Sequence, residues 1–273
     1  MSSATRLSDS GLRGAWARLR AGRRKALIPY LTAGFPSAAK SLEAFRAADR
    51  IADILEVGVP FSDPLADGPT IQRSTFEALK QGMTLPGALE LVSRAELSKP
   101  VVLFSYLNPI LRYGLTRFLK DAADLGIAGL LLTDLPAGSD PEVEGEVQES
   151  PLDLIRLVAP TSRPERVAEA VRGAQGFVYV IARLGVTGAS PQLAADLTDT
   201  IARVRAATTL PIAAGFGIST PAQAVAVGKL ADGVVVGSAL VEVLGREGVG
   251  AAGAYLAQLR AALDSARPEG AKT

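Results

Sequence analysis

The sequence predicts an α/β fold, a (β/α)₈ TIM barrel formed by one domain, and three observations lead to this prediction. Apolar runs of strand length alternate eight times with segments of helical spacing along the 273 residues. The apolar runs are nearly continuous, as parallel strands covered on both faces should be. Each strand and its helix take about 30 residues, and eight such units fit a closed barrel better than an open sheet.

The chain begins with a basic segment, for which we predict a helical extension over residues 1–25. Within it, Leu12, Trp16 and Leu19 share one face of a helix expected over 10–21. A transit peptide is the alternative interpretation. Because neither an apolar signal core nor a small-residue cleavage site follows, the helix is favoured.

The predicted elements then follow in order. Strands are expected at 26–34, 52–59, 100–107, 127–136, 152–160, 176–185, 210–217 and 231–240. Helices are expected at 37–50, 70–82, 85–98, 115–126, 140–149, 163–172, 220–228 and 251–266. One more helix is expected after the loop that follows the sixth strand, and it ends at about residue 207. Ser37 is a candidate cap, and Gly82 is a candidate helix end. We therefore predict one domain over 1–265 and a disordered tail over 266–273.

The composition excludes several kinds of chemistry. Cys and His are both absent, which excludes disulfides, thiol nucleophiles, Cys/His zinc sites and imidazole bases. Acid–base chemistry must then use Asp, Glu, Tyr or Lys, and we predict no metal. The net charge of +1 gives no nucleic-acid footprint. No apolar run reaches the roughly 18–20 residues of a membrane span, so we predict a cytoplasmic protein that binds neither nucleic acid nor membrane.

The stretch LEVGVPFSDPLADGP, residues 55–69, carries three carboxylates and no Lys or Arg. Glu56 lies among aliphatic residues near the end of a predicted strand. If its side chain faces the barrel interior, burial will raise its pKa, which suits a general acid–base near neutral pH. A structural ion pair is the alternative for Glu56. For Asp63 and Asp67 the alternative is turn formation beside Pro and Gly, and it is favoured for Asp63.

Three glycine-bearing loops fall together late in the chain, at 185–190, 215–220 and 236–240. The last two open directly into predicted helices, whose N-termini bind phosphate through free amides. In barrels of this kind, the loops after the seventh and eighth strands are a common phosphate site. Ser238 adds a hydroxyl donor. Ordinary turns are the alternative, but three such loops at these strands favour a phosphate site.

Aromatic residues make up only 5% of the chain, yet several fall at predicted strand ends. They are Tyr30, Phe104, Tyr106, Tyr179 and Phe216. Packing in the barrel core is one interpretation. An apolar slot for a flat ring, beside the phosphate site, is the other.

Eight motifs in order resemble one known family. They are LTAGFP, LEVGVPFSDPLADGPTIQ, LNPILRYG, GLLLTDLP, LVAPTS, ARLGVTGA, GFGIS and DGVVVGSALV. From about residue 27 to 244 the chain thus resembles the α subunit of tryptophan synthase. The resemblance implies a barrel lyase, without a cofactor of its own, that cleaves indole-3-glycerol phosphate to indole and glyceraldehyde 3-phosphate. It further implies a β subunit that carries pyridoxal phosphate, an αββα heterotetramer, and a tunnel through which indole passes.

The resemblance also implies roles for individual residues. Glu56 and Asp67 match the two catalytic carboxylates of the family. The indole pocket of the family corresponds in this sequence to Tyr106, Leu131, Tyr179 and Phe216. Phosphate contacts are matched by Gly188, Gly217, Gly237 and Ser238. Thr187, in the loop after strand 6, matches the Thr that closes against the catalytic Asp. Asp63 and Asn108 match positions at which the family meets its β subunit. Departures from the family pattern occur at Ala182 and at Ala137–Gly138.

Two other functions stay open from the residues alone. One is a phosphate-binding barrel with another reaction, such as a sugar-phosphate isomerase or epimerase. The absence of His and the aromatic slot make that function less attractive. The other is a non-catalytic subunit that only activates a partner, and the presence of both carboxylates disfavours it.

Overall fold

Eight parallel strands close into a barrel in chain order, with β1 paired to both β2 and β8. A computed structural model describes residues 11–160, 162–182, 191–215 and 217–266. The strands are β1 (Ala26–Thr32), β2 (Leu55–Gly58), β3 (Val101–Ser105), β4 (Gly129–Leu132), β5 (Asp153–Val158), β6 (Val178–Ile181), β7 (Ile212–Gly215) and β8 (Gly233–Val236). The predicted closed barrel is therefore confirmed.

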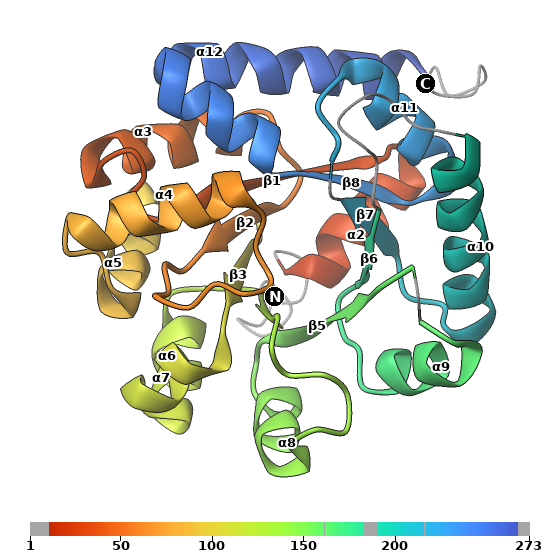
Figure 1. The fold of residues 1–273 in the computed structure, drawn as a ribbon, viewed down its shortest axis with the longest axis horizontal. Coiled ribbons are helices and arrows are strands. Elements are labelled where there is room, and N and C mark those ends of the chain that lie inside the picture. The colour runs from red at the N-terminus through yellow and green to blue at the C-terminus, as the bar shows by residue number, and fades with distance from the viewer. Residues whose placement is uncertain (1–10, 161, 183–190, 216, 267–273) are drawn as a thin grey trace, which may run out of the picture.

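Helices surround the strands as a ring (Figure 1). They are α3 (Ala38–Asp49), α4 (Pro69–Lys80), α5 (Leu85–Ala95), α6 (Leu107–Tyr113), α7 (Leu115–Asp124), α8 (Pro141–Glu149), α9 (Pro164–Arg172), α10 (Pro191–Ala207), α11 (Pro221–Leu230) and α12 (Ser238–Ser265). Several begin where the sequence places a cap. The side chain of Ser37 accepts the Lys40 amide at the start of α3, and Thr220 forms a capping box with Gln223 at the start of α11.

The N-terminal helix α2 (Leu12–Ala21) covers the end of the barrel where the strands begin. Two glycines at strand starts make room for it. A Cβ on Gly129 would lie 3.0 Å from Cδ1 of Leu12, and a Cβ on Gly233 would lie 2.9 Å from Cη2 of Trp16. Trp16 also packs on Phe177 with ring centroids 5.7 Å apart. Because α2 closes this end, the carboxyl ends of the strands remain available for a site.

The observed strands are shorter than predicted, and at two places the structure has a helical segment that was not predicted. The predicted strand over 100–107 ends at Ser105, and helix α6 follows directly. The amide of Leu107 donates to Oδ1 of Asp134 at 2.8 Å. A residue distant in sequence thus supplies the hydrogen-bond acceptor for the first amide of α6. The last helix begins at Ser238 instead of 251, and the non-helical backbone of Gly248 divides it. Among the described residues, none of the helices combines the length and apolar character of a membrane span.

Candidate active site

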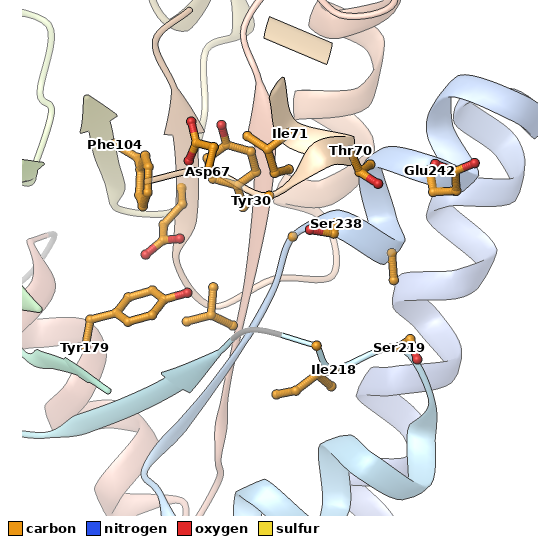
Figure 2. A pocket seen from close by; sticks show the side chains of 16 residues that line it. Tyr30, Asp67, Thr70, Ile71, Phe104, Tyr179, Ile218, Ser219, Ser238 and Glu242 are labelled. Atoms are coloured by element: carbon orange, nitrogen blue, oxygen red, sulfur yellow. The ribbon is translucent and has the colours of Figure 1, made fainter. Parts of the chain in front are cut away.

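A pocket with a cavity volume of about 430 Å³ opens among the carboxyl ends of the strands. From the strands it is lined by Tyr30, Glu56, Phe104, Tyr179 and Val235. The segment after β2 contributes Asp67, Gly68, Thr70 and Ile71. The segments after β7 and β8 contribute Gly217, Ile218, Ser219, Gly237, Ser238 and Ala239, and α12 adds Glu242. Figure 2 shows Asp67, Phe104 and Tyr179 on one side and Ser219, Ser238 and Glu242 on the other.

Glu56 is a buried carboxyl group inside the barrel. It lies beside Tyr30 and Val102 in the parallel ladder, and only 1% of its surface is exposed. Its Oε1 atom has no hydrogen-bond partner among the described residues. Burial raises the pKa of Glu56 to about 8, because the apolar surroundings disfavour the charged form. At neutral pH this carboxyl group therefore carries a proton that it is able to donate.

Asp67 reaches the same pocket from the loop after β2. The loop is held by its own backbone and by Tyr106, whose hydroxyl accepts the Ala66 amide at 2.9 Å. The side chain of Gln72 donates to the Asp67 carbonyl at 3.0 Å. Burial raises the pKa of Asp67 to about 6, and a hydrogen bond from Tyr106 partly offsets this effect. Asp67 is therefore mostly ionised at neutral pH, in contrast to Glu56.

Aromatic side chains form the apolar part of the pocket. The rings of Tyr30 and Phe104 meet edge to face, with centroids 5.3 Å apart. Burial is the main cause that raises the pKa of Tyr179 well above its ordinary value, and the nearby Glu56 adds to it. A Cβ on Gly215 would lie 2.5 Å from the Tyr179 hydroxyl, so glycine is needed there. The lining suits a flat apolar ring.

The opposite part of the pocket offers backbone amides. Gly237 precedes α12, and none of the described side chains caps this helix start, so its first amides stay available for an anion. At α11 the situation differs, because Oε1 of Gln223 accepts the amides of Ser219 and Thr220 at 2.8 and 3.1 Å. Gly217 has a φ of +78°, which favours glycine. An anionic group therefore fits best at the start of α12, beside the Ser238 hydroxyl.

Comparison with known proteins identifies the family. The family model described as tryptophan synthase alpha chain matches residues 16–264. A tryptophan synthase alpha chain of Citrifermentans bemidjiense is 47% identical over 241 residues, which cover 87% of this chain and 88% of that protein. The chain belongs to the tryptophan synthase alpha chain family. It is a lyase of tryptophan biosynthesis that cleaves indole-3-glycerol phosphate to indole and glyceraldehyde 3-phosphate.

Other members of the tryptophan synthase alpha chain family share both sequence and fold with this chain. The alpha chain of Chloroflexus aurantiacus is 44% identical, covering 93% of this chain and 97% of its own. A structure of Mycobacterium tuberculosis tryptophan synthase superposes with a TM-score of 0.86 at 40% identity, covering 93% and 98% of the two chains. The alpha subunit of Legionella pneumophila superposes with a TM-score of 0.84 at 34% identity, covering 93% and 98%.

The structure brings together some of the residues matched to the tryptophan synthase alpha chain and not others. Six of the described ones line the pocket, namely Glu56, Asp67, Tyr179, Gly217, Gly237 and Ser238. Tyr106 does not line it but forms a hydrogen bond with Asp67. Leu131 is fully buried in β4 and does not line the pocket. Asp63 and Asn108 are exposed. Thr187, Gly188 and Phe216 lie outside the described residues.

Three lining residues with polar side chains were not among the site residues selected from the sequence, namely Thr70, Ser219 and Glu242. For Glu242 a signal was available, because it follows Ser238 by four residues and therefore shares its helical face. Ser219 lies in the glycine-bearing loop 215–220, but the sequence does not show that its side chain reaches the pocket, and Thr70 carries no signal. Within the described ranges, no three Asp or Glu side chains gather as a metal site.

Proposed function

We propose that Glu56 and Asp67 perform the lyase reaction as a pair with different protonation states. The observation that carries this proposal is that both carboxyl groups line one pocket, while burial raises the pKa of Glu56 to about 8 and that of Asp67 only to about 6. Near neutral pH one group is then an acid and the other an anion. Two carboxyl groups whose environments separate their pKa values are typical of acid–base catalysis.

The proposed reaction is a retro-aldol cleavage. Glu56 donates its proton to C3 of the indole ring, which gives the indolenine form with a positive ring nitrogen. The same carboxylate then removes the proton of the C3′ hydroxyl. The C3′ oxygen forms the aldehyde, the C3–C3′ bond breaks, and its electrons return to the ring as indole leaves. Asp67 accepts a hydrogen bond from the ring N–H and stabilises the positive charge that develops there.

The phosphate group is proposed to bind at the start of α12. Free amides and the helix dipole favour a dianion there, and Ser238 offers its hydroxyl. The aromatic rings at the other side of the pocket take the indole, so the two ends of the substrate fix the bond to be broken. The loop residues Thr187 and Gly188, together with Phe216, are proposed to complete the site by resemblance to the family.

Substitution of each carboxyl group tests the proposal. Glu56→Gln keeps the size of the side chain but carries no acidic proton, so we expect indole release to fall by at least about a thousandfold, combining the loss of general acid and base. Asp67→Asn should lower kcat by about a hundredfold or more, because the amide stabilises the ring cation poorly.

Indole release from indole-3-glycerol phosphate would be followed spectrophotometrically, with binding of glycerol 3-phosphate as the control for an intact phosphate site. That affinity should stay within a few-fold in both variants. Normal turnover by Glu56→Gln would refute the assignment. A near-native rate in Asp67→Asn would return Asp67 to a turn-forming role.

We further propose that the chain binds a tryptophan synthase β subunit, which carries pyridoxal phosphate, in an αββα heterotetramer. The resemblance supports this proposal, and so does the surface beside the pocket. Leu65, in the Asp67 loop, is 91% exposed, and Leu111 on α6 is 50% exposed. Asp63 and Asn108 are exposed on the same two segments. Among the described residues, Leu65 and Leu111 are the two most exposed large apolar side chains, and exposed apolar patches mark protein–protein surfaces.

Addition of the β subunit should raise the lyase rate of the chain, because docking on the Asp67 loop would hold Asp67 in place. The measurement is indole formation, and tryptophan formation when serine is present, with and without the β subunit. Leu65→Asp should weaken this activation about tenfold or more, while the rate of the chain alone changes little. Lys80→Asp, on the far end of α4, is a control that should leave the activation intact. Equal activation of wild type and Leu65→Asp would argue against this surface.

A further inference from the structure

An ion pair at the rim of the pocket has no part in the proposed mechanism. Arg73 lies on α4, and its Nη2 atom is 2.5 Å from Oε2 of Glu242 on α12. The two side chains are 52% and 36% exposed. Pairs with this exposure contribute little to stability. Their position at the substrate pocket therefore points to an effect on binding.

Glu242 lies at the end of the pocket that offers amides. It lines the cavity together with Ser238 and follows it by one helical turn, so both side chains project from the same face of α12. Figure 2 shows the two on the same side of the pocket, together with Thr70 of α4. A carboxylate in this place repels a phosphate group bound at the start of the helix.

The charges of the lining make this repulsion important. The ionisable carboxyl groups that line the pocket are Glu56, Asp67 and Glu242, and no Lys or Arg lies among the described lining residues. Arg73 supplies the missing cation from just outside. It follows the lining residue Thr70 by three positions on α4, and its guanidinium contacts the Glu242 carboxylate directly.

We propose that Arg73 sets the affinity of the pocket for the phosphate end of the substrate by neutralising Glu242. The ligand class is a phosphate monoester dianion. This inference rests on the proposed function, which puts the phosphate at the start of α12. Arg73 acts through Glu242 and is a positioning residue, so its loss changes substrate binding and leaves the chemical step intact.

Kinetics of charge-neutral variants test the proposal. Arg73→Gln should raise the KM for indole-3-glycerol phosphate roughly five- to tenfold and leave kcat within about twofold, because an uncompensated carboxylate then faces the phosphate. The effect should shrink at high ionic strength. The double variant Arg73→Gln/Glu242→Gln should return KM to within about twofold of wild type, since it removes the repelling charge as well.

Two competitive inhibitors separate the ends of the pocket. Inhibition by glycerol 3-phosphate should weaken in Arg73→Gln in parallel with KM, whereas inhibition by indole should not change. Arg94→Gln is the matched control. It removes a cation from another exposed pair, with Glu90 at 3.4 Å on α5, and should leave KM unchanged.

An unchanged KM in Arg73→Gln, or a double variant that fails to restore it, would overturn the proposal. Failure of the rescue is also the result that a purely structural link between α4 and α12 predicts. Gly237→Asp separates this inference from the proposed function, because it puts a negative charge at the helix start itself. If Gly237→Asp leaves KM unchanged, the phosphate placement is wrong. If it raises KM while Arg73→Gln does not, only the role of Arg73 is wrong.

Discussion

Glu56 and Asp67 show how two carboxyl groups in one pocket acquire different protonation states. Glu56 is fixed in a strand and almost completely desolvated, and its Oε1 has no partner among the described residues. Asp67 is on a loop, is less buried than Glu56, and accepts a hydrogen bond from the Tyr106 side chain. Hydrogen bonding to the charged form lowers a pKa, whereas burial alone raises it. The difference between them therefore comes from partner atoms as well as from depth.

This difference predicts a bell-shaped dependence of kcat/KM on pH. Activity should rise as Asp67 ionises, with a pKa of about 6, and should fall as Glu56 loses its proton, with a pKa of about 8. The measurement is kcat/KM for indole release between about pH 5 and pH 9. In Asp67→Asn, the residual activity should lose the acidic limb and keep the alkaline one. Retention of both limbs would assign the acidic limb to another group.

At the scale of elements, glycines in strands make space for the side chains of the pocket. Gly58 ends β2 beside Tyr30, and a Cβ there would lie 2.7 Å from Cε2 of the Tyr30 ring. Likewise, a Cβ on Gly215 of β7 would lie 2.5 Å from the hydroxyl of Tyr179 in β6. A strand glycine usually weakens a sheet, so its presence marks a close approach. These strands thus lack a side chain at one position, and the space is taken by the tyrosine ring of the neighbouring strand.

Gly58→Ala should therefore lower the free energy of unfolding by about 1–3 kcal/mol through overpacking. It should also reduce lyase activity, because Tyr30 lines the pocket and must move. Chemical denaturation and indole release are the two measurements. Gly145→Ala in α8 is the control, since a Cβ there meets no atom of the described residues within 4 Å, and it should raise stability by about 0.5–1 kcal/mol. Equal stability of Gly58→Ala and wild type would mean that Tyr30 has room to shift.

At the scale of the whole molecule, the last helix secures the end of the barrel opposite the pocket. Arg260 of α12 is 9% exposed. Its Nη1 atom donates to the Lys25 carbonyl at 2.9 Å and to Oδ2 of Asp53 at 3.0 Å. The same Asp53 oxygen accepts the Leu27 amide at 2.9 Å. One guanidinium thus ties α12 to β1 and to the turn before β2.

Arg260→Met should lower the free energy of unfolding by about 1–3 kcal/mol, because the Asp53 carboxylate and the Lys25 carbonyl then lose the guanidinium that donates to them. Urea denaturation measures this change. Arg94→Met removes a guanidinium from an exposed pair and should change stability by less than about 0.5 kcal/mol. Similar losses in the two variants would show that the Arg260 network adds nothing beyond a surface ion pair.

Local patterns in the sequence were sufficient for the order of elements, because the period of apolar residues depends only on neighbours along the chain. Helix α6 was missed since its start depends on Asp134, 27 positions away. The carboxylates were found because 55–69 is unusual in itself. Glu242 was missed because the last helix was expected only from 251, so its spacing of one helical turn from Ser238 was not recognised. Leu131 matched a family position, yet its side chain is buried beside the pocket instead of lining it.

The sequence by itself determined the barrel, the absence of thiol and imidazole chemistry, and the candidates Glu56 and Asp67. These depend on periodicity, composition and motif, which are all local. Only the tertiary structure decided that Glu56 lies inside the barrel, where its Oε1 has no partner within the described part of the chain, and that Arg73 meets Glu242 across 169 positions. A pKa depends on desolvation and on nearby charges. Both arise only when distant segments pack together, so the chemistry of the pocket could not be read from any one stretch.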